Sequence, residues 1–569
     1  MNSDMVRLRV TPGARSCHVR RMSLSASPAR GDSSSPWRPH WWQNGVVYQI
    51  YPLSFADSNG DGLGDLAGIR SRLSHLQELG VDALWISPFY PSPLADFGYD
   101  VSDYCGVDPR FGSLDDFDAL VAQAHSLGLR VLLDFIPNHC SDQHPWFLAA
   151  QQDRRHPQRD WFLWHDGKPG ADKNAPRGLP NNWLSEFGGP AWTWHEATRQ
   201  YYLHSFLKQQ PDLNWRNPEL RRAMLDVLRF WLGRGVDGFR VDAIHHLFKD
   251  AAWRDNPPNP DFRPGMSPRK QVLRRYTTDL PEIHAAVREM RAVLDQSGPD
   301  KVLIGEAYLP FERLVAYYGE HLDGFHLPFN FHLIHTRWDA AALRAMIAEY
   351  ESALPSGAWP NWVLGNHDRS RIASRIGPAQ ARVAAVLLCT LRGTPTLYYG
   401  DEIGMHDVPI APEQVHDPFE KNVPGLGLGR DPERTPMQWS AAPHAGFSSA
   451  TPWLPLASDY QQVNVERQQA DPHSMLSLYR ALLALRRAEP ALAIGAYTPL
   501  EVAPPLLGYL RTHGDRRFGV LLNTSARELR AAVPAALRSQ TIVLSTHAGR
   551  AGGALGSDLF ADEGVVFTR

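Results

Sequence analysis

The chain has 569 residues, of which 43% are hydrophobic and 21% charged, and its formal net charge is −3. This length predicts two or three domains, and the near balance of acidic and basic residues argues against a nucleic-acid or membrane-surface partner. No apolar run reaches the roughly 18 residues of a spanning helix, and no apolar segment follows Arg20-Arg21 as in a secretion signal. We therefore expect a cytoplasmic protein that does not span a membrane.

The first 36 residues are rich in Ser, Arg, Pro and Ala without apolar periodicity, and we expect a disordered tail over 1–36. From Trp41 onward, short apolar runs alternate with helical patterns, which predicts a (β/α)8 TIM barrel of the α/β class. The eight runs are 46–51, 83–87, 131–136, 238–243, 302–307, 324–331, 362–368 and 394–400. The alternative, an open doubly wound sheet, lacks its Gly-rich phosphate-binding turn after the first strand.

The spacing of the runs sets the expected domain boundaries. About 100 residues separate the third run from the fourth, far more than an ordinary connection, so we expect an inserted domain over 140–213 after strand three. The barrel would then comprise 37–139 and 214–490. Short alternating runs such as 518–523 and 541–545 predict an antiparallel β-sandwich domain over 491–569.

Three carboxylates stand at the ends of predicted barrel strands, where the active site of such a fold lies. They are Asp242 after run four, Glu306 after run five and Asp368 after run seven. Hydrolysis of a glycosidic bond needs one protonated carboxyl and one ionised carboxylate, which such a group could supply. Neighbouring acids would raise the pKa of Glu306, the candidate acid. A single Asp at a strand end is more often a cap, so the hypothesis depends on the three occurring together.

Arg240 lies two residues before Asp242, so both side chains would point to the same side of a strand. An adjacent guanidinium favours the ionised carboxylate that a nucleophile requires, although a structural ion pair gives the same pattern. His139 and His367 follow runs three and seven, and we expect them to hydrogen-bond sugar hydroxyls rather than bind zinc. Neither HExxH spacing nor paired CxxC motifs occur, so we expect no catalytic metal or other cofactor.

The segment 57–65, Asp-Ser-Asn-Gly-Asp-Gly-Leu-Gly-Asp, places oxygen ligands at alternate positions. It is similar to the start of an EF-hand loop, but position 12 is Gly68 rather than Glu. The sequence therefore predicts a structural Ca²⁺ or Mg²⁺ site of another kind, with a ladder of Asx turns as the alternative. The expected ligands are Asp57, Asn59, Asp61, Leu63 and Asp65.

Several of these segments resemble the α-amylase superfamily, glycoside hydrolase family 13. The segments 134–139, 238–242 and 366–368, with Glu306, resemble its four signature regions. The segment 210–214, Gln-Pro-Asp-Leu-Asn, is similar to an extra motif of its oligo-1,6-glucosidase and α-glucosidase branch. The segments 48–52, 98–100 and 434–439 fit the same pattern, and the likeness covers the chain from about Trp41 onward.

The resemblance implies a retaining mechanism with Asp242 as the nucleophile and Glu306 as the general acid and then base. Asp368 would hold ring hydroxyls and stabilise the oxocarbenium-like state. The residues implied for the terminal-glucose subsite are Asp100, His139, Arg240, His367 and Arg430. Arg430, or alternatively Arg434, would join Asp100 in closing the pocket at its blind end, which favours exo-action.

Ala243 bears on linkage, because this branch tends to have Val after the nucleophile in α-1,6-specific members and Ala in α-1,4-preferring ones. The segment 245–278 is similar to an extended loop of bacterial α-glucosidases that prefer short substrates. The resemblance thus implies an exo-acting α-glucosidase on maltose-type α-glucosides, as a monomer or homodimer.

Two alternatives stay open from the sequence. The same site could serve a transglucosylase, a sucrose isomerase or a trehalose-forming enzyme, since a covalent intermediate accepts either water or a sugar hydroxyl. The segment 369–371, Arg-Ser-Arg, does not resemble the charged signature of sucrose isomerases. A non-catalytic relative like the amino-acid transporter heavy chains is disfavoured, because those have a membrane span and lack the intact set of acids.

Overall fold

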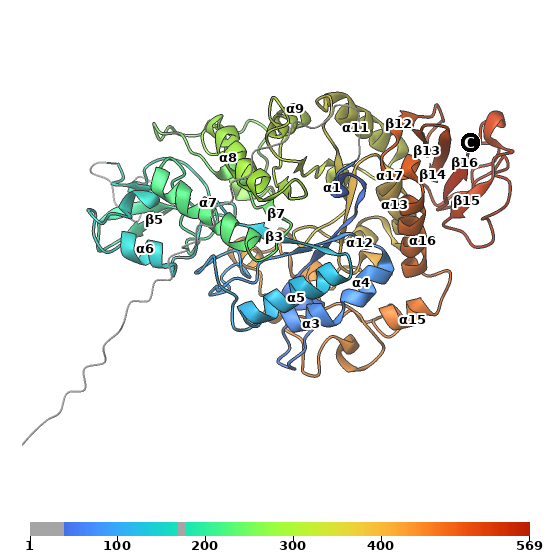
Figure 1. Ribbon diagram of the computed structural model, residues 1–569. Coiled ribbons are helices and arrows are strands. Elements are labelled where there is room, and N and C mark those ends of the chain that lie inside the picture. Colours follow the sequence, from blue (N-terminus) through green and yellow to red (C-terminus); the bar gives the residue numbers. More distant parts are fainter. Residues whose placement is uncertain (1–38, 169–177) are drawn as a thin grey trace, which may run out of the picture.

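The computed structural model describes residues 39–168 and 178–569. Eight parallel strands form a nearly closed barrel in the order β10-β11-β1-β2-β3-β7-β8-β9 (Figure 1). They are β1 Val47–Ile50, β2 Ala83–Ile86, β3 Arg130–Phe135, β7 Gly238–Val241, β8 Val302–Gly305, β9 Leu327–Pro328, β10 Asn361–Val363 and β11 Thr394–Tyr398. Each predicted run overlaps one of these strands, so the TIM-barrel prediction is confirmed. The expected disordered tail, 1–36, lies outside the described residues.

One asparagine joins the two strands at the seam of the barrel. β9 and β10 stand at opposite ends of the strand order and are not paired with each other. Asn361 Nδ2 donates to the carbonyl of Pro328 (2.9 Å), and Asn361 Oδ1 accepts from the amide of Asn330 (2.9 Å). This side chain supplies the polar contacts that a ladder would otherwise make, and so brings the ends of the sheet together.

Helices surround the barrel because each presents an apolar stripe to the strands. The longer ones are α3 Leu66–Ser71, α4 Leu73–Leu79, α5 Leu114–Ser126, α7 Pro218–Leu232, α8 Glu282–Ser297, α11 Ala340–Ala353, α13 Pro378–Thr390 and α16 Met475–Ala488. In α7, Asn217 caps the first turn and Pro218 occupies its first position, while Leu220, Met224 and Trp231 are buried. Burial of each such side chain stabilises the fold by about 1.5–3 kcal/mol.

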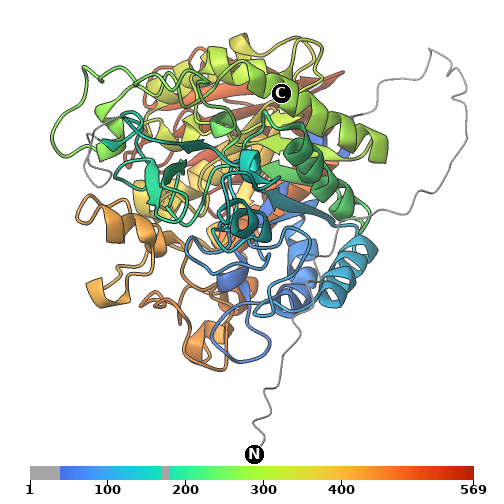
Figure 2. The same cartoon turned by 90° about the vertical axis from the view of Figure 1, so that its left-hand side faces the viewer.

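The segment between β3 and β7 forms its own small sheet. The strands β4 Trp164–His165, β6 Gln200–Leu203 and β5 Trp192–His195 pair antiparallel in that order, and α6 Pro145–Ala150 precedes them. Trp183 and Trp192 stack in a separate apolar cluster, with ring centroids 6.0 Å apart. These elements lie at one end of the molecule in Figure 1 and in front of the barrel in Figure 2.

The C-terminal segment forms one five-stranded antiparallel sheet at the opposite end of the molecule (Figure 1). Its order is β12 Ala496–Pro499, β13 Leu506–His513, β14 Arg516–Asn523, β16 Gly564–Thr568 and β15 Ile542–Ser545. One face packs on α11, α13 and α17 (Pro490–Ala493), and the other on residues of its own loops such as Leu537 and Leu559. The expected β-sandwich is therefore a single sheet among the described residues, because barrel helices take the place of a second sheet.

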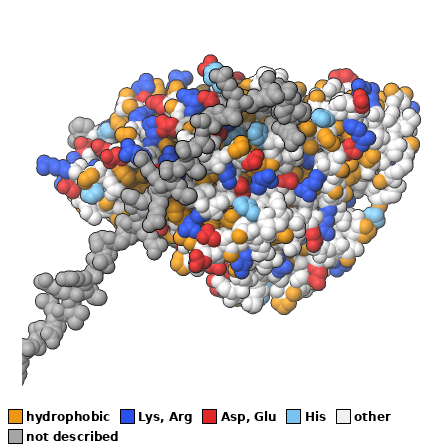
Figure 3. Space-filling view, viewed as in Figure 1, with side chains coloured by type: hydrophobic (Ala, Val, Ile, Leu, Met, Phe, Trp, Pro, Cys, Tyr) orange, Lys and Arg blue, Asp and Glu red, His pale blue; other side chains and the backbone are white. Residues whose placement is uncertain are grey.

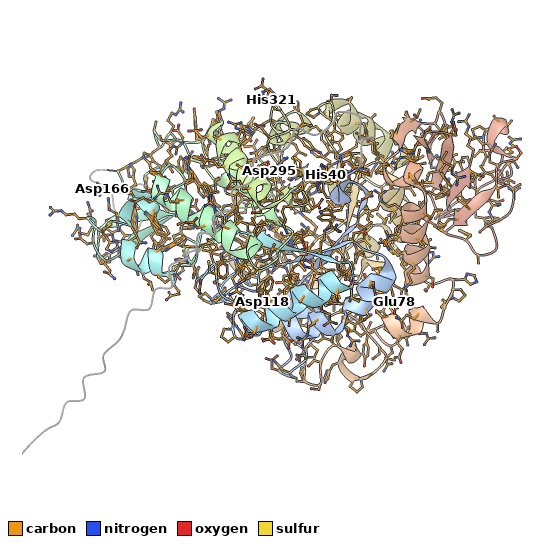
Figure 4. All side chains as sticks on the ribbon, in the orientation of Figure 1. His40, Glu78, Asp118, Asp166, Asp295 and His321 are labelled. Carbon is orange, nitrogen blue, oxygen red and sulfur yellow. The ribbon has the colours of Figure 1, made fainter. Side chains whose placement is uncertain are left out.

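Charged residues of both signs are interspersed over the face shown in Figure 3, in keeping with the small net charge. Figure 4 labels Glu78 on α4, Asp118 on α5 and Asp295 on α8, all on the outer helices. Glu78 and Asp118 are exposed carboxylates that pair with partly exposed arginines, an arrangement that contributes about 0–1 kcal/mol per pair. In the part of the chain that the structure describes, no helix has the length and apolar content to cross a membrane.

Candidate active site

A cavity of about 550 Å³ opens at the carboxyl ends of the barrel strands. Asp242, Glu306 and Asp368 all line it, so the three predicted carboxylates do meet at one site. The other predicted residues that line it are His139, Ala243, His367 and Arg430. Two predicted residues, Arg240 and Asp100, do not line it and are fully buried.

Arg240 lies beneath the cavity and holds three carboxylates together. Its Nη1 donates to Asp242 Oδ1 (2.8 Å), and its Nη2 is 2.6 Å from Glu306 Oε2. It also bonds to Asp134, which lies directly across from it in the register of β3 and β7. The i, i+2 spacing predicted the first of these contacts. The contacts with Glu306 and Asp134 depend on neighbouring strands, which the spacing alone does not place.

The pKa of Asp242 differs from the sequence-based expectation. Burial raises it well above its ordinary value, Arg240 acts in the opposite direction, and the nearby carboxylates raise it further. We expected Arg240 to lower the pKa of Asp242, and the net direction is the reverse. The reason is that Asp242 shares the Arg240 guanidinium with Asp134 and Glu306. One positive charge does not offset the effect of burial on the pKa of Asp242.

Glu306 is fixed just after β8 by an ion pair and a hydrogen bond. Besides Arg240, its Oε2 accepts the backbone amide of Ala243 at 2.9 Å. Ala243 can present that amide because it adopts a left-handed backbone, with φ 42°. The residue after Asp242 therefore orients the second carboxyl as well as lining the cavity.

Asp368 stands five residues beyond β10, since the predicted run 362–368 is a strand only at its start. Its Oδ1 accepts from Arg434 Nη2 (2.8 Å) and Arg430 Nη1 (3.2 Å). Burial opposes ionisation, but His367 and these two guanidinium groups hold the pKa of Asp368 below its ordinary value. Asp368 is therefore an anion with two fixed cationic partners.

Arg430 lines the cavity and pairs with Asp96, another lining residue, rather than with Asp100. Arg430 Nη2 donates to Asp96 Oδ1 (2.7 Å) and is held from behind by Asp417. Asp100 instead accepts from Ser92 Oγ (2.8 Å) and from the amides of residues 95 and 96. The placement of Asp100 at the blind end is thus corrected to Asp96, because Asp100 is consumed in folding its own turn.

The two histidines are neutral hydrogen-bonding groups of the wall. Burial lowers the pKa of His139 to about 4 and that of His367 well below its ordinary value. The ring nitrogens of His367 lie 2.7 Å from Gln49 Nε2 and 2.8 Å from the Tyr99 hydroxyl. Tyr99 also stacks on this ring, with centroids 5.4 Å apart. Sequence reasoning missed Tyr99 as a site residue, although it belongs to one of the recognised segments.

A charged cluster at the cavity wall was not predicted. Glu186, from the inserted segment, bonds to Arg269 and Arg274 of the 245–278 segment. Although burial opposes ionisation, these two guanidinium groups lower the pKa of Glu186 to about 2. Glu186 lies 83 positions from Arg269 and 88 from Arg274 in the sequence, so no local pattern indicates their contact.

The loop 57–65 shows the predicted Asx-turn ladder. The Asp57 carboxylate accepts the amides of Asn59, Gly60 and Gly62 at 2.7–2.9 Å, and Asp65 caps α3. The donors have the oxygen chemistry that calcium prefers. Among the described residues, however, no group of three or more His, Cys, Asp or Glu is arranged to hold a metal ion. The calcium site stays a prediction.

The family profile for "Alpha amylase, catalytic domain" matches residues 49–495. The chain belongs to the alpha-amylase family. It is accordingly a glycoside hydrolase, as the strand-end carboxylates predicted, and the sequence-based recognition is confirmed.

Named members of the alpha-amylase family cover most of the chain. A "Probable alpha-glucosidase" of Rhizobium meliloti (strain 1021) is 44% identical over 501 residues, which is 85% of this chain and 89% of that protein. An "Oligo-1,6-glucosidase" of Halalkalibacterium halodurans is 37% identical over 89% of this chain and 95% of its own.

The same family supplies similar solved structures. An "alpha-glucosyl transfer enzyme, XgtA" has a TM-score of 0.86 at 41% identity, covering 93% of this chain and 100% of its own. The trehalulose synthase MutB of Pseudomonas mesoacidophila MX-45 has a TM-score of 0.85 at 32% identity, covering 94% and 100%.

Proposed function

We propose that this protein is a retaining, exo-acting α-glucosidase that releases glucose from the non-reducing end of short α-1,4-linked saccharides such as maltose. The observation that carries the proposal is the cavity itself. Asp242 and Glu306 line it and share the Arg240 guanidinium beneath it, and the Arg430–Asp96 ion pair also lines it. In our proposal this ion pair forms the blind end of the cavity, which accepts a chain end and excludes a chain interior.

The proposed reaction has two displacements. Asp242 attacks the anomeric carbon while Glu306 gives its proton to the glycosidic oxygen, so the C–O bond breaks and the leaving sugar departs as an alcohol. A water molecule then attacks the same carbon, Glu306 takes its proton, and the bond to Asp242 breaks. Two inversions return the α-anomer. Contact of both carboxyls with one guanidinium supports the short separation, about 5–5.5 Å, of retaining enzymes.

Asp368 supplies the negative charge that the oxocarbenium-like transition state needs. Its anion is held by Arg430 and Arg434, so it need not reorganise as positive charge develops on the sugar. His139 and His367, kept neutral by burial, line the cavity wall, and neighbouring side chains hold both ring nitrogens of each.

The α-1,4 preference is supported by Ala243, the small residue that follows the nucleophile and lines the cavity. Among the relatives, "Maltase 1" of Drosophila virilis is 42% identical over 477 residues. A relative named oligo-1,6-glucosidase is also similar, so linkage is a point to measure.

A second candidate function, glucosyl transfer, is favoured by a specific observation. Two of the similar solved structures are named an alpha-glucosyl transfer enzyme and a trehalulose synthase. In that case a sugar hydroxyl, rather than water, would accept the glucosyl group from Asp242.

The proposal is tested by turnover of maltose, isomaltose, sucrose and trehalose, with Asp242→Asn and Glu306→Gln as variants. We expect maltose to be the best substrate, glucose the main product, and both variants to lose at least about a thousandfold in kcat, since each removes an essential group. Glucosylated products that dominate at modest maltose concentration would favour transfer instead. Wild-type turnover by Asp242→Asn would refute the nucleophile assignment.

A further inference from the structure

Five arginines line the cavity, and four of them are held by carboxylate or carbonyl acceptors. Arg269 and Arg274 pair with Glu186, and Arg430 pairs with aspartates. Arg375 donates to backbone carbonyls, including that of Ser370 at 3.0 Å.

Arg369 is the exception. Its half-buried guanidinium is hydrogen-bonded to the Tyr308 side chain but has no carboxylate or carbonyl acceptor among the described residues, and its buried Nε has no partner. It follows Asp368 directly in the chain, so it stands beside the reacting groups. Because a guanidinium carries five donor hydrogens, this one retains donors for a ligand.

An aromatic ring fixes the direction of this guanidinium. Arg369 Cζ lies 5.2 Å from the ring centroid of Tyr308, within cation–π range. Tyr308 is in turn stacked on the buried ring of Phe331, with centroids 4.2 Å apart and planes 13° from parallel. Arg369 is therefore positioned by Tyr308 rather than by an ion pair, and its remaining N–H groups can donate to a ligand.

The strand order places this group across the mouth from the blind end. Tyr308, Phe331 and Arg369 follow β8, β9 and β10, whereas Asp96 follows β2. In a ring of eight strands with this order, β9 stands opposite β2. Glu306, which precedes Tyr308 by two residues, would protonate the glycosidic oxygen that joins the bound glucose to the leaving sugar.

We propose that Arg369, oriented by Tyr308, is the binding residue for the leaving sugar: its guanidinium donates hydrogen bonds to adjacent hydroxyls of the unit that departs. The inference rests on the proposed function, since it needs a glucosyl residue bound at the Asp96 end. The geometry of a guanidinium suits this role, because two of its N–H groups lie in one plane and can donate to two neighbouring oxygens. Arg369 would therefore bind leaving groups that carry several hydroxyls, such as sugars, and would not bind aryl leaving groups.

The test compares two substrates that share the terminal glucose and differ in what leaves. The leaving group of maltose is a glucose unit, which has adjacent hydroxyls. The leaving group of p-nitrophenyl α-glucoside is a phenol, which has none. For Arg369→Ala, we expect the ratio of kcat/KM on maltose to that on the aryl glucoside to fall about ten- to a hundredfold, as when one or two charge-assisted hydrogen bonds are lost. Arg369→Lys, which keeps the charge and loses the planar fork, should recover only part of the ratio.

Further variants separate the orienting role of Tyr308 from a general loss of activity or stability. Tyr308→Ala should lower the same ratio, and the double variant Arg369→Ala/Tyr308→Ala should lose less than the product of the single losses, because the ring acts through the guanidinium. Tyr308→Phe, which keeps the ring but removes the hydroxyl that bonds to Arg369, should lower the ratio less than Tyr308→Ala does. Arg530→Ala, an exposed arginine of the C-terminal segment, is the matched control.

The outcomes are distinguishable. A fall in the ratio for Arg369→Ala at an unchanged melting temperature supports the inference. Equal losses on both substrates, or no loss on either, would overturn it while leaving the proposed function intact. Failure of the wild-type enzyme to hydrolyse either substrate would overturn the proposed function and this inference with it.

Discussion

Replacing Asp96 by Asn tests whether the Arg430 end of the cavity binds the terminal glucose. The Asp96 carboxylate accepts from Arg430 Nη2 (2.7 Å) and from Gln210 Nε2 (3.1 Å), and it lines the cavity. Arg430 keeps Asp417 after the substitution, so no unpaired buried charge is created. We therefore expect a modest cost in the free energy of unfolding, about 1–2 kcal/mol.

The effect on catalysis should be larger than the effect on folding. Under the proposed function, the charged acceptor lost from Asp96 also binds a glucose hydroxyl, and one such bond contributes about 1.5–3 kcal/mol. At about 1.4 kcal/mol per factor of ten, kcat/KM for maltose should fall by about 10- to 150-fold. The assay is initial-rate kinetics on maltose, together with thermal unfolding of the same preparation.

Asp100→Asn is the matched control, because it makes the same chemical change four residues away. The two oxygens of the Asp100 carboxylate together accept three hydrogen bonds within its own turn. In the Asp100→Asn variant an NH₂ group replaces one of these oxygens and would face a donor, so at least one hydrogen bond is lost. We expect a clear loss of stability with less than about a tenfold change in kcat/KM. The reverse pattern, with Asp100→Asn the more damaging to kcat/KM, would refute the assignment of Asp96 to the blind end.

Three further predictions address acid dependence, the metal loop and the charged wall. Burial raises the pKa of Asp242, and only its ionised form is the nucleophile. As the pH decreases, kcat/KM should therefore fall with an apparent pKa above the ordinary Asp value of about 3.9. An apparent pKa below about 3.9 for this acid limb would contradict the prediction. If the loop 57–65 binds calcium, added Ca²⁺ should raise Tm and EDTA should lower it, and Asp61→Ala should abolish both shifts. Glu186→Gln should lower Tm and weaken maltose binding, measured as KM, because it leaves Arg269 and Arg274 without their buried anion; Tm and KM equal to wild type would show the cluster to be dispensable.

The barrel and its three acids could be predicted because their signal is local. Each strand is a short apolar run, and parallel strands bring their carboxyl ends to one rim, so Asp242, Glu306 and Asp368 had to meet. The choice between Asp96 and Asp100 could not be made in this way. Leu94 and Phe97 adopt left-handed backbones, with φ 61° and 49°, and this turn decides which acid faces the cavity.

Properties that depend on the whole site were beyond the sequence. The spacing of Arg240 and Asp242 indicates an ion pair, but the pKa of Asp242 also depends on burial and on Asp134 in a neighbouring strand. The cluster around Glu186 forms only when the inserted segment meets the 245–278 segment. Long-range contacts of this kind have no periodic pattern along the chain.

The central claim, a retaining mechanism through Asp242, is tested most directly by the anomer of the first glucose released from maltose, followed by NMR before mutarotation. The two-displacement reaction predicts α-glucose as the initial signal, with the β-anomer growing only at the rate of mutarotation. Initial release of β-glucose would mean a single displacement by water and would contradict the account.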